Sequence, residues 1–174
     1  MSDLHFYEPR NGHAAVPGLA HDPLNSIVAP RPIGWKDSVA NIAATGEFVW
    51  NLATRELAAP MNASAAMVAA GVDEFELAGL EAAPSRLVAP PRVAASPVAF
   101  ECRHTQTMRL QGIDGAEIDT WLILGEVVGI HIAPQLIEDG AYRTAAAHPI
   151  LRGGGPADYF EISDDTRFEM RRPG

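Results

Sequence analysis

The sequence predicts a mainly β protein with short helices, folded as a single domain over residues 1–174 and arranged as a β-barrel with helices on its rim. The chain contains 14 prolines and 15 glycines, which indicate many turns and therefore short strands and loops. Two long apolar segments, 98–110 and 121–132, are suited to pair as a hairpin. No strand–GxGxxG–helix unit occurs, so a dinucleotide-binding doubly wound sheet is not expected.

Composition narrows the class of protein. A hydrophobic content of 47% supports a buried core, and a net charge of −9 argues against a nucleic-acid partner without excluding an anionic ligand. Cys102 is the single cysteine, so no intramolecular disulfide forms and no oxidising compartment is implied. The sequence shows neither a long apolar run nor an apolar signal core at its start, and we therefore expect a soluble, cytoplasmic protein.

The first half of the chain alternates short elements. Residues 1–24 read as irregular, and the proline-rich apolar segment 26–35 as an edge strand or a strand approach. Apolar residues at helical spacing predict a helix over 36–45, which Gly46 ends, and 47–52 reads as a buried strand. Thr54 is a candidate cap for a helix that runs towards Ser64 and is interrupted at a proline.

The second half is dominated by the two long strands. A short helix is expected within 72–80, closed by Gly79, followed by a proline-rich connection over 84–97. The strands 98–110 and 121–132 flank a turn at 113–116, and alternation places four side chains of the first strand on one face: Phe100, Cys102, His104 and Gln106. Residues 136–142 read as an acidic turn or short helix, and the tail as loop with a short strand near 159–162.

The junction between Trp35 and Lys36 is unusual, because an apolar strand leads into a helix with no turn residue between them. Such connections usually take roughly two to six residues. Either one of the two elements ends a few residues away from its expected boundary, or residues are missing at this point.

The start of the expected helix offers a phosphate site. Free backbone N–H groups and the helix dipole favour an anion there, Lys36 adds a positive charge and Ser38 a hydroxyl, while Asp37 is expected to cap the backbone. From periodicity alone, an ordinary solvated helix start is the commoner explanation of the same residues.

Other polar residues carry weaker signals. None of the six histidines has ligand spacing, and Cys102 with His104 reads as a packed strand pair, so no metal site is expected. The segment 152–155 looks like a phosphate cradle but lacks P-loop spacing, and a flexible turn is the preferred interpretation. No catalytic acid, base or nucleophile is assigned. The six histidines are His5, His13, His21, His104, His131 and His148.

Nine short runs, in order and with fitting spacing, together resemble the flavin reductase domain family, which includes the small flavin-supplying components of two-component monooxygenases. The runs are HFYEP at 5–9, APRPIGW at 29–35, KDSVANI at 36–42, TGEFV at 45–49, NLAT at 51–54, MNAS at 61–64, GVDEF at 71–75, GEVVG at 125–129 and HPI at 148–150.

The resemblance implies an FMN-binding split β-barrel of Greek-key type that forms a homodimer with the flavin near the interface. It implies an oxidoreductase, an NAD(P)H-dependent flavin reductase that binds FMN, takes electrons from NAD(P)H and supplies reduced flavin to a monooxygenase partner or another acceptor. The flavin would carry the redox chemistry. Lys36, Asp37 and Ser38 match the phosphate-contacting helix start of the family, and Arg31 would have a supporting role.

The sequence departs from the family after Trp35. Family members continue there with a Ser-Thr pair, a hairpin, a segment of the type Asn-x-Ala-Pro-x-Ser-x-Phe and a further strand, all of which contribute to the flavin site and none of which occurs here. Loss of two core strands would expose unpaired edges, which favours residues missing from this sequence over a true deletion. A true deletion would instead imply a non-enzymatic split-barrel protein that has lost flavin binding and acts through dimerisation or partner binding.

Overall fold

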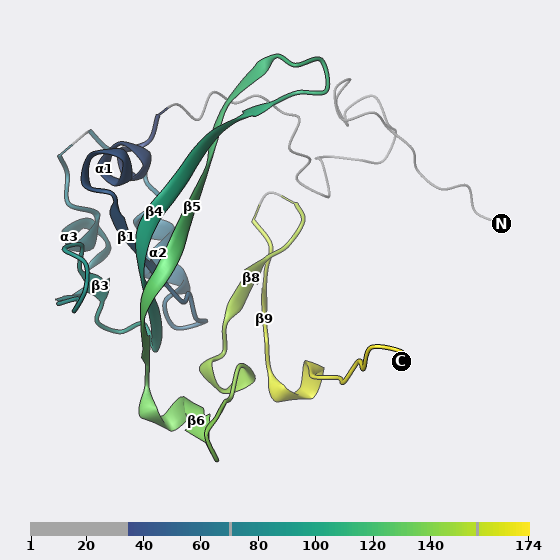
Figure 1. Cartoon of the computed structure of the whole chain (residues 1–174). Helices are drawn as coiled ribbons and strands as arrows, with labels where there is room; N and C mark the ends of the chain where they lie inside the picture. Colours follow the sequence, from purple (N-terminus) through teal and green to yellow (C-terminus); the bar gives the residue numbers. More distant parts are fainter. Residues whose placement is uncertain (1–34, 70, 156) are drawn as a thin grey trace.

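A computed structural model describes residues 35–69, 71–155 and 157–174. Arg31, and all but the last residue of the strand expected over 26–35, lie outside the described residues. Strands predominate over short helices, which confirms the predicted class, and the two longest strands form a twisted ribbon through the middle of the molecule (Figure 1).

The central sheet has three antiparallel strands in the order β1-β4-β5, with β4 in the middle. Its strands are β1 (Glu47–Asn51), β4 (Val98–Gln111) and β5 (Glu117–Ile132). Three short two-stranded sheets complete the described strands: β2 (Ala82–Ala83) with β3 (Arg92–Val93), β6 (Ile137–Glu138) with β7 (Ala141–Tyr142), and β8 (Ile150–Arg152) with β9 (Tyr159–Glu161). The predicted strands at 47–52, 98–110, 121–132 and 159–162 are thereby confirmed.

The β4–β5 hairpin is irregular along its length. Its register shifts at three places, one of them between His104 and Gln106, and such bulges bend a ribbon and increase its twist. The bulge interrupts the strict alternation of side chains, so the predicted common face of Phe100, Cys102, His104 and Gln106 does not extend through Gln106. The turn forms where predicted, with the Gly112 N–H donating to the Ala116 carbonyl at 2.8 Å.

The described part of the chain has three α-helices, which lie to one side of the ribbon or behind it (Figure 1). They are α1 (Asp37–Thr45), α2 (Ala58–Ala63) and α3 (Glu74–Ala78). Local signals set their ends. Gly46 adopts a left-handed conformation with φ 71° and closes α1, and the Asp73 carboxylate accepts the Phe75 N–H at 2.8 Å to cap α3. Thr54 caps only the turn before α2, where its hydroxyl accepts the Leu57 N–H at 3.4 Å.

The segment 136–142 is a hairpin, so the turn expected there is confirmed and the alternative of a short helix is wrong. A 3₁₀ turn over Pro134–Leu136 leads into β6, and β7 returns with Ile137 opposite Tyr142. Asp139 and Gly140 both have positive φ, at 50° and 76°, which is the backbone of a tight hairpin turn. Two further 3₁₀ turns cover Ala145–Ala147 and Asp164–Thr166.

A small apolar core lies where the lower end of the central sheet meets the 3₁₀ turns. Val98, Leu136 and Ala147 are buried together there, with Phe100 and Ile132 packed against them. The same sheet leaves other apolar side chains of the described residues open to solvent, among them Trp50 at 44%, Val127 at 44% and Ile130 at 60% exposure. The strand expected to be buried at 47–52 is therefore only partly covered, although Trp50 stacks on Phe100 with ring centroids 4.9 Å apart.

Candidate functional site

Helix α1 begins at the position that the sequence predicts. Lys36 is extended, with φ −67° and ψ 154°, and its carbonyl accepts the N–H groups of Val39 at 2.9 Å and Ala40 at 3.0 Å. The chain therefore passes from Trp35 into the helix through one extended residue. No side-chain hydrogen bond caps this helix, so the expectation that Asp37 caps the backbone is not met.

The donors at this helix start fit a phosphate group. The backbone N–H groups of Asp37 and Ser38 lie in the first turn of the helix, where N–H groups have no carbonyl acceptor within the helix. Neither N–H group bonds to another described residue. The side chains of Lys36, Asp37 and Ser38 are all exposed. An ammonium, a hydroxyl and two free N–H groups at a positive helix end match what a phosphate requires, while the Asp37 carboxylate is an opposing charge.

Aromatic rings lie next to this helix start. The Trp35 ring meets the Trp121 ring of β5 edge-on, with centroids 5.1 Å apart, and the Arg109 guanidinium lies 5.3 Å from the Trp121 centroid. Arg109 of β4 and Trp121 of β5 are opposite each other in the strand register. The Arg109 guanidinium also forms an ion pair with the Glu117 carboxylate. Trp35 is 49% exposed, whereas Trp121 is half-buried between the Trp35 ring and the Arg109 guanidinium. Sequence reasoning missed Arg109 and Trp121, since only the hairpin register brings them to Trp35.

The three described pockets have volumes of about 400, 490 and 790 Å³, and Lys36, Asp37 and Ser38 line none of them. None of these pockets therefore adjoins the start of helix α1 in the described part of the chain. Nothing in the described part of the chain tests Arg31.

A buried carboxylate, which sequence reasoning also missed, lies in the central strand. Glu101 on β4 is 0% exposed and accepts three hydrogen bonds: from the Arg86 N–H at 2.7 Å, the Leu87 N–H at 2.6 Å and His131 Nε2 at 2.6 Å. Burial by itself raises the pKa of Glu101, but the hydrogen bonds and the charge of His131 outweigh it and lower the pKa to about 2. Glu101 is therefore an anion that pins the loop before β3 onto the sheet.

The segment after His148 carries several polar contacts, and residues 153–155 lie in the connection between β8 and β9, in agreement with the turn preferred for 152–155 over a phosphate cradle. The Arg152 guanidinium donates to the carbonyls of Asp158 at 2.9 Å and Gly155 at 3.0 Å, and lies 5.1 Å from the Tyr159 ring centroid. His148 Nδ1 lies 2.5 Å from a Glu161 carboxylate oxygen. These contacts hold the β8–β9 hairpin together.

No group of three histidine, cysteine, aspartate or glutamate side chains within 35–69, 71–155 and 157–174 is placed to hold a metal ion. No helix in the same part of the chain is long and apolar enough to cross a membrane.

The chain belongs to the flavin reductase like domain family, whose model matches residues 15–149. That range includes all four predicted cofactor-binding residues, Arg31, Lys36, Asp37 and Ser38, and the whole central sheet. The resemblance inferred from the short sequence runs is thereby confirmed.

Curated relatives of uncharacterized function support the same membership. An uncharacterized protein of Deinococcus radiodurans is 39% identical over 140 residues, which cover 79% of this chain and 58% of that protein. Another, from Halalkalibacterium halodurans, is 33% identical over 138 residues, which cover 78% of this chain and 66% of that protein. The chain thus spans between 58% and 66% of the length of these two relatives, which are the longer proteins.

Solved structures confirm the split-barrel fold. Nitrilotriacetate monooxygenase component B from Bacillus cereus superposes with a TM-score of 0.70 at 29% identity, over 78% of this chain and 65% of that one. A putative flavin reductase with a split barrel domain from Shewanella frigidimarina gives a TM-score of 0.65 at 21% identity, over 83% of this chain and 67% of that one.

Proposed function

We propose that the protein is an FMN-binding, NAD(P)H-dependent flavin reductase, which works as a homodimer and supplies reduced flavin to a monooxygenase or another acceptor. Membership of the flavin reductase like domain family supports the flavin chemistry. The likeness to a monooxygenase component supports the kind of acceptor. The donor, the acceptor, the homodimer and the choice of FMN over FAD are parts of this proposal.

The observation that carries the proposal is the start of helix α1 within the family-matched region. Lys36 and Ser38 would hold the FMN phosphate by charge and by hydroxyl, with the N–H groups of Asp37 and Ser38 as further donors and Arg31 in support. The bound flavin would supply the redox chemistry, by accepting a hydride and passing electrons on. The chain's own residues would bind and orient it.

A titration of the protein with FMN and, separately, with FAD tests the proposal. We expect FMN to bind with quenched flavin fluorescence, and the loaded protein to oxidise NADH or NADPH. Lys36→Gln should weaken FMN binding about fivefold to tenfold, which corresponds to about 1 kcal/mol for one exposed charge at a helix end. Arg171→Gln, which removes a charge at the exposed C-terminal tail, is the matched control. Absence of binding at high micromolar FMN would count against the proposal.

A second function is supported by the exposed apolar side chains of β1 and β5 together with the absence of the family segment after Trp35. In this alternative the protein binds no flavin and acts through dimerisation or partner binding. It predicts a stable dimer in sedimentation together with no FMN uptake, whereas the first function predicts FMN uptake.

A further inference from the structure

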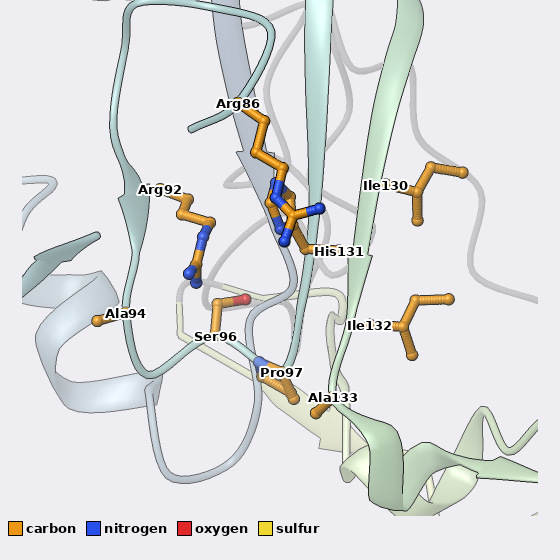
Figure 2. Close-up of a pocket in the computed structure, with 9 residues that line it drawn as sticks. All are labelled: Arg86, Arg92, Ala94, Ser96, Pro97, Ile130, His131, Ile132 and Ala133. Carbon is orange, nitrogen blue, oxygen red and sulfur yellow. The ribbon is translucent and has the colours of Figure 1, made fainter. Parts of the chain in front are cut away.

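A pocket of about 400 Å³ is lined in part by His131, the partner of the buried Glu101 (Figure 2), and none of its lining residues belongs to helix α1. Its walls come from the loop before β3, from β3 and the turn after it, and from the end of β5. The residues that line it are Arg86, Arg92, Ala94, Ser96, Pro97, Ile130, His131, Ile132 and Ala133. This lining set contains two guanidinium groups and an imidazole but no carboxylate, in a chain whose net charge is −9.

The two arginines lack partners within the described part of the chain. Neither guanidinium takes part in an ion pair or hydrogen bond with a described residue, and Figure 2 shows both side chains reaching into the pocket. Arg92 Nε is buried and has no hydrogen-bond partner among the described residues. An unsatisfied buried donor on a charged group is costly, and native structures usually satisfy one with a ligand, an ion or water.

The backbone that presents these arginines is fixed in advance by side chains of the central sheet. Glu101 accepts the Arg86 N–H at 2.7 Å, and the Asn51 amide oxygen accepts the Val93 N–H at 3.0 Å, directly after Arg92. Within the loop, the Ser85 hydroxyl donates to the Pro90 carbonyl at 2.6 Å. A site whose backbone is already ordered before the ligand binds is preorganised, so little binding free energy is lost in ordering it.

Glu101 lies next to the pocket but does not line it, and no ion pair joins its carboxylate to either arginine within the described residues. Its carboxylate is engaged by two backbone N–H groups and by His131, at distances from 2.6 to 2.7 Å. His131 uses Nε2 for that contact, which leaves Nδ1 as its other polar atom at the pocket wall. The guanidinium groups therefore keep their positive charge for a ligand.

We propose that this pocket binds an oxyanion of the phosphate class. The guanidinium groups of Arg86 and Arg92 would hold the anion, and His131 would form the adjacent wall of the pocket. The planar guanidinium fork matches phosphate oxygens with two parallel hydrogen bonds. The pocket has room for more than the anion alone, so the phosphate can be free or be part of a nucleotide. This assignment is independent of the proposed flavin site, since no residue is shared between them.

Amide-resolved NMR of the full chain tests the assignment, with inorganic phosphate and AMP titrated separately and sodium chloride added to matched ionic strength. We expect saturable shifts of the amide signals of Arg92, Ala94 and Ser96 with phosphate or AMP and not with chloride. Tighter binding of AMP would identify a nucleotide phosphate as the source, and equal or tighter binding of inorganic phosphate would identify the free anion.

Arg92→Gln should weaken this binding at least tenfold, and Arg171→Gln, at an exposed position, should leave it unchanged. Arg86→Gln provides a second test at an exposed side chain whose replacement leaves the backbone bond to Glu101 intact, so a loss of binding there does not reflect misfolding. Equal phosphate response in the wild type and both pocket variants, or the same shifts with chloride, would overturn the proposal.

Discussion

Replacement of the buried carboxylate by its amide, Glu101→Gln, gives the sharpest test of how the loop before β3 is held. The two carboxylate oxygens of Glu101 accept from Arg86 N–H, Leu87 N–H and His131. Glutamine keeps one acceptor oxygen, and its amide N–H₂ must then face a backbone N–H that has no other acceptor. One buried N–H left unsatisfied costs about 1 to 3 kcal/mol, and the remaining two bonds lose their charge assistance, at about 1 kcal/mol or less each.

Together these losses predict that Glu101→Gln lowers the free energy of unfolding by about 3 kcal/mol. For a chain of this size that corresponds to a fall in Tm of about 6 to 12 °C. Urea unfolding followed by circular dichroism measures the first quantity, and a thermal melt the second. Glu126→Gln, at an exposed position of β5, is the control and should stay within about 0.5 kcal/mol of the wild type.

Hydrogen exchange locates the effect. The amides of Arg86 and Leu87 should be protected in the wild type and lose protection selectively in Glu101→Gln, because the carboxylate is their acceptor. A stability within about 0.5 kcal/mol of the wild type, with both amides still protected, would refute the reasoning. It would mean that glutamine at position 101 holds the loop as well as glutamate does.

Three further predictions concern acid stability, close packing and a helix cap. Because the pKa of Glu101 is lowered from 4.5 to about 2 in the fold, its contribution is complete above about pH 4.5 and is lost as pH falls towards 2; acid titration should show a smaller loss over this range in Glu101→Gln than in the wild type. Gly125→Ala should destabilise by about 1 to 3 kcal/mol in urea, because the added Cβ would lie 2.5 Å from the Phe48 ring; unchanged stability would contradict that packing. Asp73→Ala should cost about 1 kcal/mol, as it removes the cap on Phe75, and Asp73→Asn should restore most of it in the same unfolding assay.

The elements with local signals could be predicted from the sequence. The end of α1 at Gly46, the end of α3 at Gly79 and the long β4–β5 hairpin each depend on residues close together in the chain. A turn within 136–142 was one of the two alternatives expected from the sequence, and it forms at Asp139-Gly140, a residue pair typical of tight hairpins. The strands β6 and β7 beside it have two residues each, which is too short for an alternating pattern to predict them.

Contacts between distant segments could not be predicted. Glu101 forms hydrogen bonds with backbone N–H groups 14 and 15 residues away and with a histidine 30 residues away. No spacing pattern in the sequence predicts such partners. The bulge after His104 likewise arises from how β4 pairs with β5, and it changes which side chains share a face. The helix start at Lys36 was found because its signals are local, whereas the rings of Trp35 and Trp121 come together only through the fold.

The comparison of FMN with riboflavin is the most direct test that a flavin phosphate docks at the start of helix α1. The two ligands share the ring system and differ in the phosphate, so the ratio of their dissociation constants isolates the phosphate contact. Fluorescence titrations should show FMN binding at least tenfold tighter than riboflavin to the wild type, with the ratio falling towards one in the double variant Lys36→Gln, Ser38→Ala. Equal affinity for both ligands in the wild type, or the same ratio in the variant, would contradict the account.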